Sequence, residues 1–233
     1  MVSAQVVAAV TGTPSALPVA IFLIPIFAGF IILLGGRRHH RFCQATALLT
    51  AAAMAVLAAW IAAQVLAGAV LTAWGDELRV DALSALVVLV ICFVGLAATI
   101  YSIRYLEHQQ LLDRVGVGRA ERRLAIFYAL FVWFLGTMTW AAVTNNIVML
   151  YVAVEATTLT SGLLVAFFWD RRALEAGYKY MMLLTVGITF ALFGCVVIYA
   201  AGAATGALDG RDALMISHVR GVAHLIPDRT ALI

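Results

Sequence analysis

The chain has 233 residues, of which 64% are hydrophobic and only 12% are Asp, Glu, Lys or Arg. A soluble domain carries about 25% charged residues, so this composition excludes a disordered chain, a nucleic-acid-binding protein and an ordinary soluble enzyme. The mean hydropathy is +1.03 and the formal net charge is only +3. The remaining class is a polytopic membrane protein, provided that the apolar residues form runs long enough to span a bilayer.

Six apolar runs meet this length. A spanning helix needs about 20 mostly apolar residues, because the hydrocarbon core is ~30 Å thick and a helix rises ~1.5 Å per residue. We therefore predict an all-α bundle of six transmembrane helices in a single integral membrane domain over residues 1–233. The helices are expected near 17–34, 43–71, 82–103, 124–143, 147–168 and 177–201, with 202–233 as an outside loop or the start of a truncated next helix.

The positive charges are unevenly distributed among the loops. Eleven Lys and Arg residues lie in the loops after the first, third and fifth runs and at the start of the sixth run, whereas the opposite loops contain only Arg79. The positive-inside rule places the eleven-cation side in the cytoplasm. Both termini are then expected on the outside.

Glu155 is the only acidic or basic residue well inside a predicted span. It lies eight residues from one end of the 147–168 run, which corresponds to a depth of ~12 Å. A charged carboxylate there costs several kcal/mol, so the group must be protonated, paired or next to a wet cavity. Two interpretations stay open: an intramembrane proton relay, or a structural carboxyl kept neutral by its neighbours.

Polar residues surround this position along the same run. Tyr151 at i−4 and Thr158 at i+3 share a helix face with Glu155. Their hydroxyls can hydrogen-bond the carboxyl or hold a water beside it, or they can serve close helix packing. Asn146 precedes the run and is a suitable N-cap for a helix that begins at Ile147. The alternative for Asn146 is a polar mouth of a proton path.

The sixth run carries a second group of candidates. Lys179 lies within one turn of the cytoplasmic boundary, where it either snorkels to the interface or takes part in proton transfer. Its depth differs from that of Glu155 by ~16 Å on antiparallel helices, so we expect no direct contact between the two. Thr185 and Thr189 are spaced i, i+4 and can face the same polar interior.

Redox and metal chemistry is not expected in this chain. The five histidines all lie outside the predicted spans, whereas a membrane haem needs axial ligands inside the bundle. The three cysteines lie far apart and have no metal or disulfide spacing. Gly116-Val117-Gly118 lacks the rest of a nucleotide-binding fingerprint. We therefore expect no cofactor and no bound metal here.

Two segments carry a family resemblance. The sequence from Thr144 to Ser161, TNNIVMLYVAVEATTLTS, resembles the fifth-helix signature of antiporter-like, proton-translocating membrane subunits. This family includes subunits of complex I, Mrp-type cation/proton antiporters and membrane-bound hydrogenases. The sequence from Leu174 to Tyr180, LEAGYKY, resembles the start of the family's sixth helix. Within the family, both segments are most similar to component F of hydrogenase-4.

The resemblance implies a subunit with a proton path through a bacterial or archaeal plasma membrane. In the family, the fifth-helix glutamate pairs with a lysine on the seventh helix, and Glu155 matches that glutamate. Lys179 matches a lysine at the start of the sixth helix. The resemblance also implies that metal clusters or a NiFe centre belong to partner subunits. Those partners are other membrane subunits and a peripheral redox arm, so the chain would serve an oxidoreductase complex without a redox centre of its own.

The chain departs from the family in length. Family members have about fourteen helices in two inverted repeats with flanking helices, and inverted repeats build the central path together. Only six helices are predicted here, without the helix-seven lysine, so we expect a fragment or a split subunit completed by a second chain. Three functions stay open: a partial subunit of a hydrogenase-4-type or complex I-like proton pump, an Mrp-type cation/proton antiporter subunit, and a non-transporting membrane scaffold.

Overall fold

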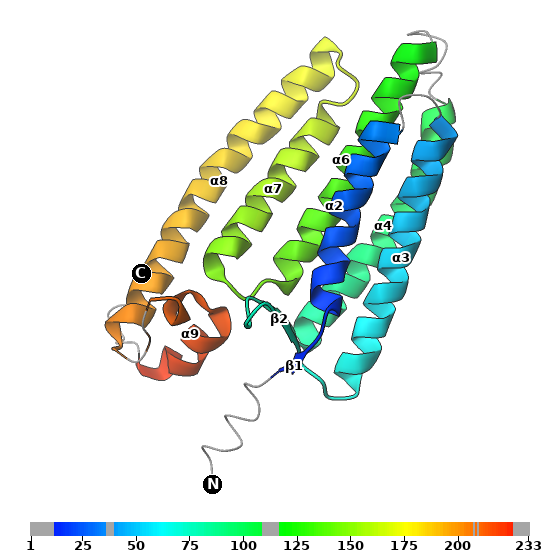
Figure 1. The fold of residues 1–233 in the computed structure, drawn as a ribbon. Helices are drawn as coiled ribbons and strands as arrows, with labels where there is room; N and C mark the ends of the chain where they lie inside the picture. Colours follow the sequence, from blue (N-terminus) through cyan, green and yellow to red (C-terminus); the bar gives the residue numbers. More distant parts are fainter. Residues whose placement is uncertain (1–11, 36–39, 109–116, 207, 209, 226–233) are drawn as a thin grey trace.

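The computed structural model describes residues 12–35, 40–108, 117–206, 208 and 210–225. Six long helices run side by side in alternating directions (Figure 1), and each is long and apolar enough to cross a membrane. The predicted multi-pass helical bundle is thereby confirmed. The helices are α2 (Leu17–Gly35), α3 (His40–Leu66), α4 (Ala82–His108), α6 (Val117–Val143), α7 (Ile147–Val165) and α8 (Arg171–Ala204).

Several helix ends differ from the predicted bounds. The second helix ends at Leu66 rather than near 71, because the chain turns at Gly68, whose φ of 91° favours glycine. The sixth helix begins at Arg171 rather than near 177, and Asp170 caps it by accepting a hydrogen bond from Ala173 N at 2.6 Å. Hydropathy detects only the apolar part of a helix, so polar turns that continue beyond it are missed.

A small sheet and three short helices lie at one end of the bundle, and the sequence did not predict them. The sheet contains β1 (Thr13–Pro14), β2 (Leu71–Ala73) and β3 (Leu78–Val80), with β2 parallel to β1 and antiparallel to β3. The chain after α8 forms η1 (Asp212–Leu214), α9 (Ile216–Val222) and η2 (Ala223–Leu225). This end is called the hairpin end below, and the opposite end is called the basic end.

Helices α2, α3, α4 and α6 pack around the apolar core. Its largest fully buried side chains include Ile21, Met54, Val88, Tyr128 and Val132. Helix α7 packs on α6, and α8 packs on α7 as an outlying helix (Figure 1). Much of the apolar surface of α8 is consequently exposed in the described chain.

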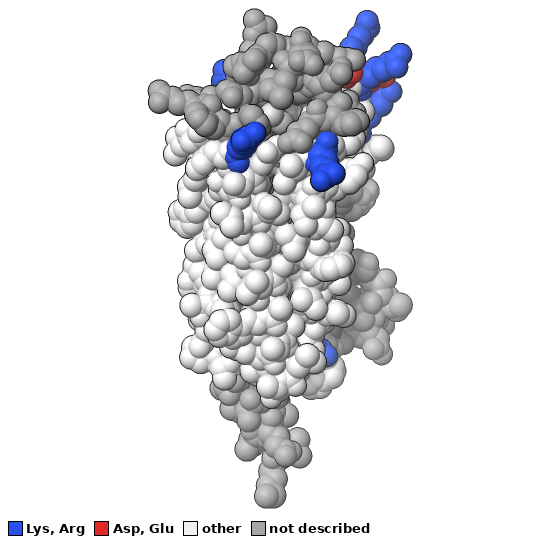
Figure 2. All heavy atoms as spheres, turned by 90° about the vertical axis from the view of Figure 1, so that its right-hand side faces the viewer, with Lys and Arg blue, Asp and Glu red and all other residues white. Residues whose placement is uncertain are grey.

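The surface pattern agrees with a membrane protein. Figure 2 shows one face of the bundle, on which the long central body is uncharged and Lys and Arg side chains gather at the upper end. The basic residues at that end include Arg41, Arg104 and Arg122, whose side chains are exposed. An uncharged belt with charges at its ends is what contact with a hydrocarbon core requires.

Candidate functional site

Helices α7 and α8 position the central acidic residue. They pass each other in antiparallel directions. Near the basic end, Gly177 faces Ala166, and a Cβ built on Gly177 would lie 2.8 Å from the Ala166 Cβ. At the other end, the Cys195 thiol lies 3.9 Å from the main-chain oxygen of Ile147. This register puts Glu155 level with the middle of α8, about halfway along the contact.

Glu155 points toward α8 in the same direction as Gly162. The two residues are spaced i, i+7 and therefore share one helix face, and a Cβ on Gly162 would collide with the Met181 side chain of α8. The Glu155 side chain is half-buried, and its Oε2 atom is fully buried without a hydrogen-bond partner among the described residues. An unpaired buried carboxyl oxygen is costly. The site therefore requires a proton, a water or a partner group from outside the described chain.

The hydroxyls around Glu155 bind main-chain carbonyls of α7 and do not bind its carboxyl. Thr158 Oγ1 donates to the main-chain oxygen of Glu155 at 2.7 Å, and Thr157 Oγ1 donates to that of Ala153 at 2.8 Å. Tyr151 lies half-buried one turn earlier and makes no hydrogen bond to Glu155 within the described chain. The expectation that Thr158 or Tyr151 bonds the carboxyl directly therefore differs from the observed geometry. Both remain close enough in sequence to line the site.

An apolar groove lies between α7, α8 and α9 at the hairpin end. It has a volume of about 550 Å³. Gly187 lies one turn before the groove on the same face of α8, at the level of Glu155, and nothing lies within 4 Å of a Cβ built on it. Neither Gly187 nor Glu155 lines the groove, which ends about one turn toward the hairpin end from the level of Glu155. It is lined by Ile147 and Leu150 of α7, by Ala191, Gly194, Cys195 and Ile198 of α8, and by Ile216, Val219 and Arg220 of α9.

The α8 candidates lie away from Glu155. Lys179 Nζ donates to Glu175 Oε1 at 2.5 Å, and their side chains are 68% and 60% exposed. No ion pair joins Lys179 to Glu155 in the described chain, as their separation in depth predicts. Thr185 and Thr189 are exposed, and each hydroxyl donates to a main-chain carbonyl one turn earlier, at 2.8 Å. These two threonines face a surface that no described helix covers, so the structure does not bring them to the Glu155 site.

Asn146 caps α7, as predicted. Its Oδ1 atom accepts hydrogen bonds from Val148 N at 2.9 Å and from Met149 N at 3.3 Å. Its Nδ2 atom donates to Glu77 Oε2 at 2.9 Å, and Arg211 Nη2 binds the other oxygen of Glu77 at 2.8 Å. The capping side chain therefore also joins the start of α7 to the β2–β3 hairpin and to the chain after α8.

Asn145, which is itself buried, extends these contacts into a partly buried network. Its Nδ2 atom donates to Asp76 O at 2.9 Å and to Ser217 Oγ at 2.8 Å, while its Oδ1 atom accepts from Ser217 N at 3.0 Å. We call Asp76, Glu77, Asn145, Asn146, Arg211 and Ser217 the polar latch. Five of these residues, all except Asn146, were not predicted as candidates from the sequence, because the partners lie 69 to 141 residues apart in the chain. In the sequence, the polar pair Asn145-Asn146 directly before α7 was the only local indication of this network.

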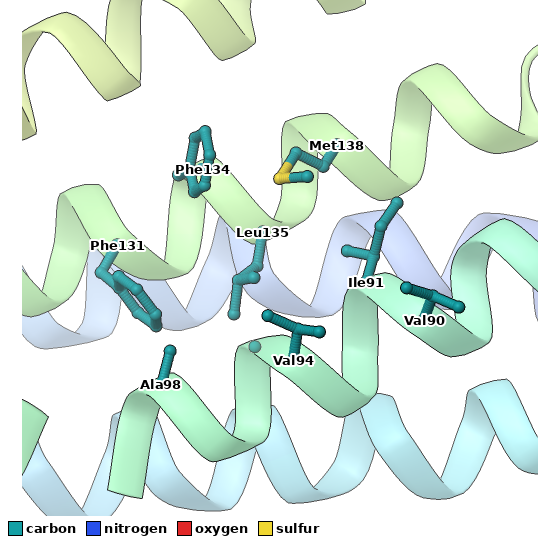
Figure 3. A pocket seen from close by; sticks show the side chains of 9 residues that line it. Val90, Ile91, Val94, Ala98, Phe131, Phe134, Leu135 and Met138 are labelled. Carbon is teal, nitrogen blue, oxygen red and sulfur yellow. The ribbon is translucent and has the colours of Figure 1, made fainter. Parts of the chain in front are cut away.

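A second groove, between α4 and α6, contains no candidate chemistry. It has a volume of about 250 Å³, and the side chains that line it are all apolar (Figure 3). Met138, Ile91 and Val94 are among them. Within the described residues, no three His, Cys, Asp or Glu side chains are grouped so as to hold a metal ion. The Glu155 site is accordingly the candidate for ion chemistry in the spans.

Comparisons with known proteins agree with the fold and with the segment around Glu155. The family model "NADH:quinone oxidoreductase/Mrp antiporter, TM" matches residues 144–216, and the model "NADH-Ubiquinone oxidoreductase (complex I), chain 5 N-terminus" matches residues 76–114. The two matched segments show that the chain is similar to the antiporter-like membrane subunits of the complex I, Mrp and hydrogenase family. The predicted family resemblance is confirmed.

Three curated relatives represent the three branches. The chain is 31% identical over 209 residues to NADH-quinone oxidoreductase subunit N of Desulforudis audaxviator, covering 84% of this chain and 38% of the relative. It is 30% identical over 125 residues to the hydrogenase-4 component F homolog of Methylacidiphilum infernorum, covering 54% of this chain and 25% of the relative. It is 33% identical over 115 residues to a Na(+)/H(+) antiporter subunit of Alkalihalophilus pseudofirmus, covering 49% of this chain and 13% of the relative.

A solved structure shares the fold. A chain of the archaeal membrane-bound sulfane sulfur reductase, a respiratory membrane complex, superposes with a TM-score of 0.69 at 20% identity. The match covers 93% of this chain and 42% of that chain. The antiporter-like chain thus spans well under half the length of these relatives.

Proposed function

We propose that the chain is part of a proton-translocating membrane subunit of a hydrogenase-4-type or complex I-like redox-driven pump, with Glu155 as its intramembrane proton relay. The observation that carries this proposal is the buried Oε2 atom of Glu155, which has no hydrogen-bond partner among the described residues, on a span that contains no other charged side chain. A carboxyl in such a place is stabilised by taking up a proton and by ion pairing or water when it loses one. A change in the surroundings of Glu155 would therefore make its carboxyl bind or release a proton.

The groove at the hairpin end of the α7–α8 contact, about one turn from the level of Glu155, would supply the approach for the missing partner group. Its walls between α7 and α8 are apolar and open, and Gly187 leaves space at the level of the carboxyl. We propose that a further helix, from a longer form of this chain or from a second chain, seats here and brings a donor or cationic side chain to Glu155. The coverage of 38% of one relative and 42% of the structural neighbour supports such a fragment or split subunit.

Lys179 has a supporting role in this proposal. Its exposed pair with Glu175 lies at the basic end of α8, eight residues before Gly187 and hence ~12 Å in depth from Glu155 at ~1.5 Å per residue. Transfer between the two sites would need waters along the α7–α8 contact. Asn146 holds the opposite end of α7 by its cap, and Tyr151 and Thr158 flank the carboxyl on its own face.

The partners and location follow from the same proposal. The chain would lie in a bacterial or archaeal plasma membrane with the basic end in the cytoplasm and both termini outside. Other membrane subunits and a peripheral arm would carry the metal clusters or NiFe centre, and this chain would bind no cofactor of its own. Exposed apolar side chains of α8, including Leu183 at 77% and Phe190 at 72%, leave a broad surface for lipid or a neighbouring subunit.

The relay role is tested by proton pumping in vesicles that contain the complete complex. Glu155→Gln removes the ionisable group at nearly constant size, and we expect it to reduce pumping at least tenfold while Glu155→Asp retains part of it. Asp212→Asn is the control, because Asp212 lies outside the spans with its side chain 60% exposed. Pumping by Glu155→Gln within twofold of wild type would favour the scaffold alternative.

A cation/proton antiporter is the second candidate, favoured by the match to the Na(+)/H(+) antiporter relative. The two functions differ in their energy source. A pump acidifies or alkalinises vesicles only when its electron donor is supplied, whereas an antiporter exchanges cations for protons along an imposed gradient. Reading the frame beyond codon 233 would in turn show whether the remaining helices belong to the same gene.

A further inference from the structure

A pair of hollows along the contact between α2 and α6 differs in character from the groove between α7, α8 and α9. Its first hollow, near the basic end, has a volume of about 250 Å³ and is lined by Leu33 and Leu34 of α2 and by Arg122, Ala125 and Ile126 of α6. A second hollow, of about 260 Å³, lies deeper and is lined by Ile26, Phe30, Trp133 and Thr137, with Thr160 of α7. We call the two hollows together the α2–α6 groove.

The two hollows lie on the same face of each helix. On α2, Ile26, Phe30 and Leu33 are spaced i, i+4, i+7, which places them in one stripe. On α6, Arg122 and Ile126 are spaced i, i+4, and Trp133 follows Ile126 by seven residues. The two hollows therefore lie in line along the α2–α6 contact, with a charged side chain at the outer one.

The length of the track matches one leaflet of a bilayer. From Arg122 to Trp133 the helix advances by eleven residues, or ~16 Å at ~1.5 Å per residue. Half of a ~30 Å hydrocarbon core is ~15 Å. Arg122 thus lies at the depth of lipid headgroups when the second hollow lies near the middle of the membrane.

The polar atoms deep in the groove are already bonded to protein. Trp133 Nε1 donates to the main-chain oxygen of Ile26 at 3.0 Å. Thr137 Oγ1 donates to that of Phe134 at 3.0 Å, and Thr160 Oγ1 donates to that of Ala156 at 2.9 Å. The inner hollow consequently offers apolar contact and no donor that a polar ligand could use.

Arg122 gives the outer hollow a positive charge. Its side chain is exposed, and no ion pair between described residues engages it. The other lining side chains of that hollow are apolar. A basic residue above an apolar groove between transmembrane helices is the arrangement that binds anionic lipid headgroups.

We propose that the α2–α6 groove binds an anionic phospholipid, with its phosphate on Arg122 and one acyl chain in the two hollows. A helix about 10 Å across would need roughly 1,200 Å³ over the same 16 Å, more than twice what the hollows offer. A slender acyl chain fits this space. The charge at the mouth selects a headgroup with net negative charge over a zwitterionic one.

The test is native mass spectrometry of the full-length purified protein, delipidated and then titrated with phosphatidylglycerol or phosphatidylcholine. We expect wild type to retain phosphatidylglycerol in preference to phosphatidylcholine. Arg122→Gln should weaken phosphatidylglycerol binding about fivefold, which corresponds to the ~1 kcal/mol that one basic residue contributes near an anionic lipid surface. Arg122→Lys should retain most of the binding.

Two further variants keep the test specific. Arg41→Gln removes an exposed charge from the basic end without touching the groove, and it should change binding less than twofold. Leu34→Trp narrows the mouth at an exposed position and should weaken binding without unfolding the protein. Equal losses for Arg122→Gln and Arg41→Gln, or no preference for phosphatidylglycerol, would overturn the proposal. Occupation of the groove by a protein segment would appear as no lipid uptake by wild type, which would overturn it as well.

Discussion

Asn145 is the residue on which the polar latch depends most. It is 5% exposed, and its side chain joins the β2–β3 hairpin to the start of α9 through Asp76 and Ser217. Asn145→Ala removes the bonds to Asp76 O and Ser217 Oγ and leaves Ser217 N without its 3.0 Å acceptor. A net hydrogen bond contributes about 1 kcal/mol and an unsatisfied buried group costs about 1–3 kcal/mol, so we expect a loss of about 3 kcal/mol in local stability.

Hydrogen exchange of the Ser217 amide measures this loss directly. Local opening that becomes easier by ~3 kcal/mol should speed exchange about a hundredfold, since each 1.4 kcal/mol is a factor of ten. Ser217→Ala is the graded comparison, because it removes the hydroxyl but keeps the main-chain bond to Asn145, and exchange there should rise only about fivefold. An Asn145→Ala variant whose Ser217 amide exchanges within threefold of wild type would refute the reasoning.

Two other predictions concern the contacts between helices. Gly29→Leu should destabilise the bundle by several kcal/mol in detergent, because any side chain at Gly29 collides with the indole of Trp133. Gly221→Ala is the control, and it should be nearly neutral because nothing lies within 4 Å of the Cβ position of Gly221. Ser161→Ala and Tyr180→Phe should each cost about 0.6 kcal/mol and should not add in the double variant, since the two hydroxyls share one 2.9 Å bond across α7 and α8. If thermal unfolding shows that the losses of stability in the two single variants add in the double variant, the bond between the two hydroxyls contributes nothing to stability.

The long apolar runs were sufficient to predict the bundle. Each of the six predicted spans corresponds to a helix, because a membrane requires about 20 apolar residues and internally satisfied backbone groups. The cap at Asn146 was also predictable, since the capping bonds involve only the next three residues. Contacts of this kind, between residues close together in the chain, can be predicted from the sequence.

The parts of the fold and of the site that were not predicted depend on contacts between segments far apart in the sequence. Neither the pairing of Leu71 with Val80 nor the bond from Arg211 to Glu77 follows from a local pattern. The position of Glu155 along its helix was predictable, but the neighbouring helix that its face meets depends on how α7 and α8 pack, as at Gly162 and Met181. From the sequence, Thr185 and Thr189 could face the same polar interior. Their exposure shows that i, i+4 spacing identifies a shared face without saying which face is covered.

The central claim is that the Glu155 carboxyl gains and loses a proton during turnover. Infrared difference spectroscopy of the complete complex, with and without its electron donor, observes protonated carboxyl groups directly. The account predicts a carboxyl difference band in wild type that shifts in Glu155→Asp and disappears in Glu155→Gln. An identical band in wild type and Glu155→Gln, with pumping intact, would contradict it.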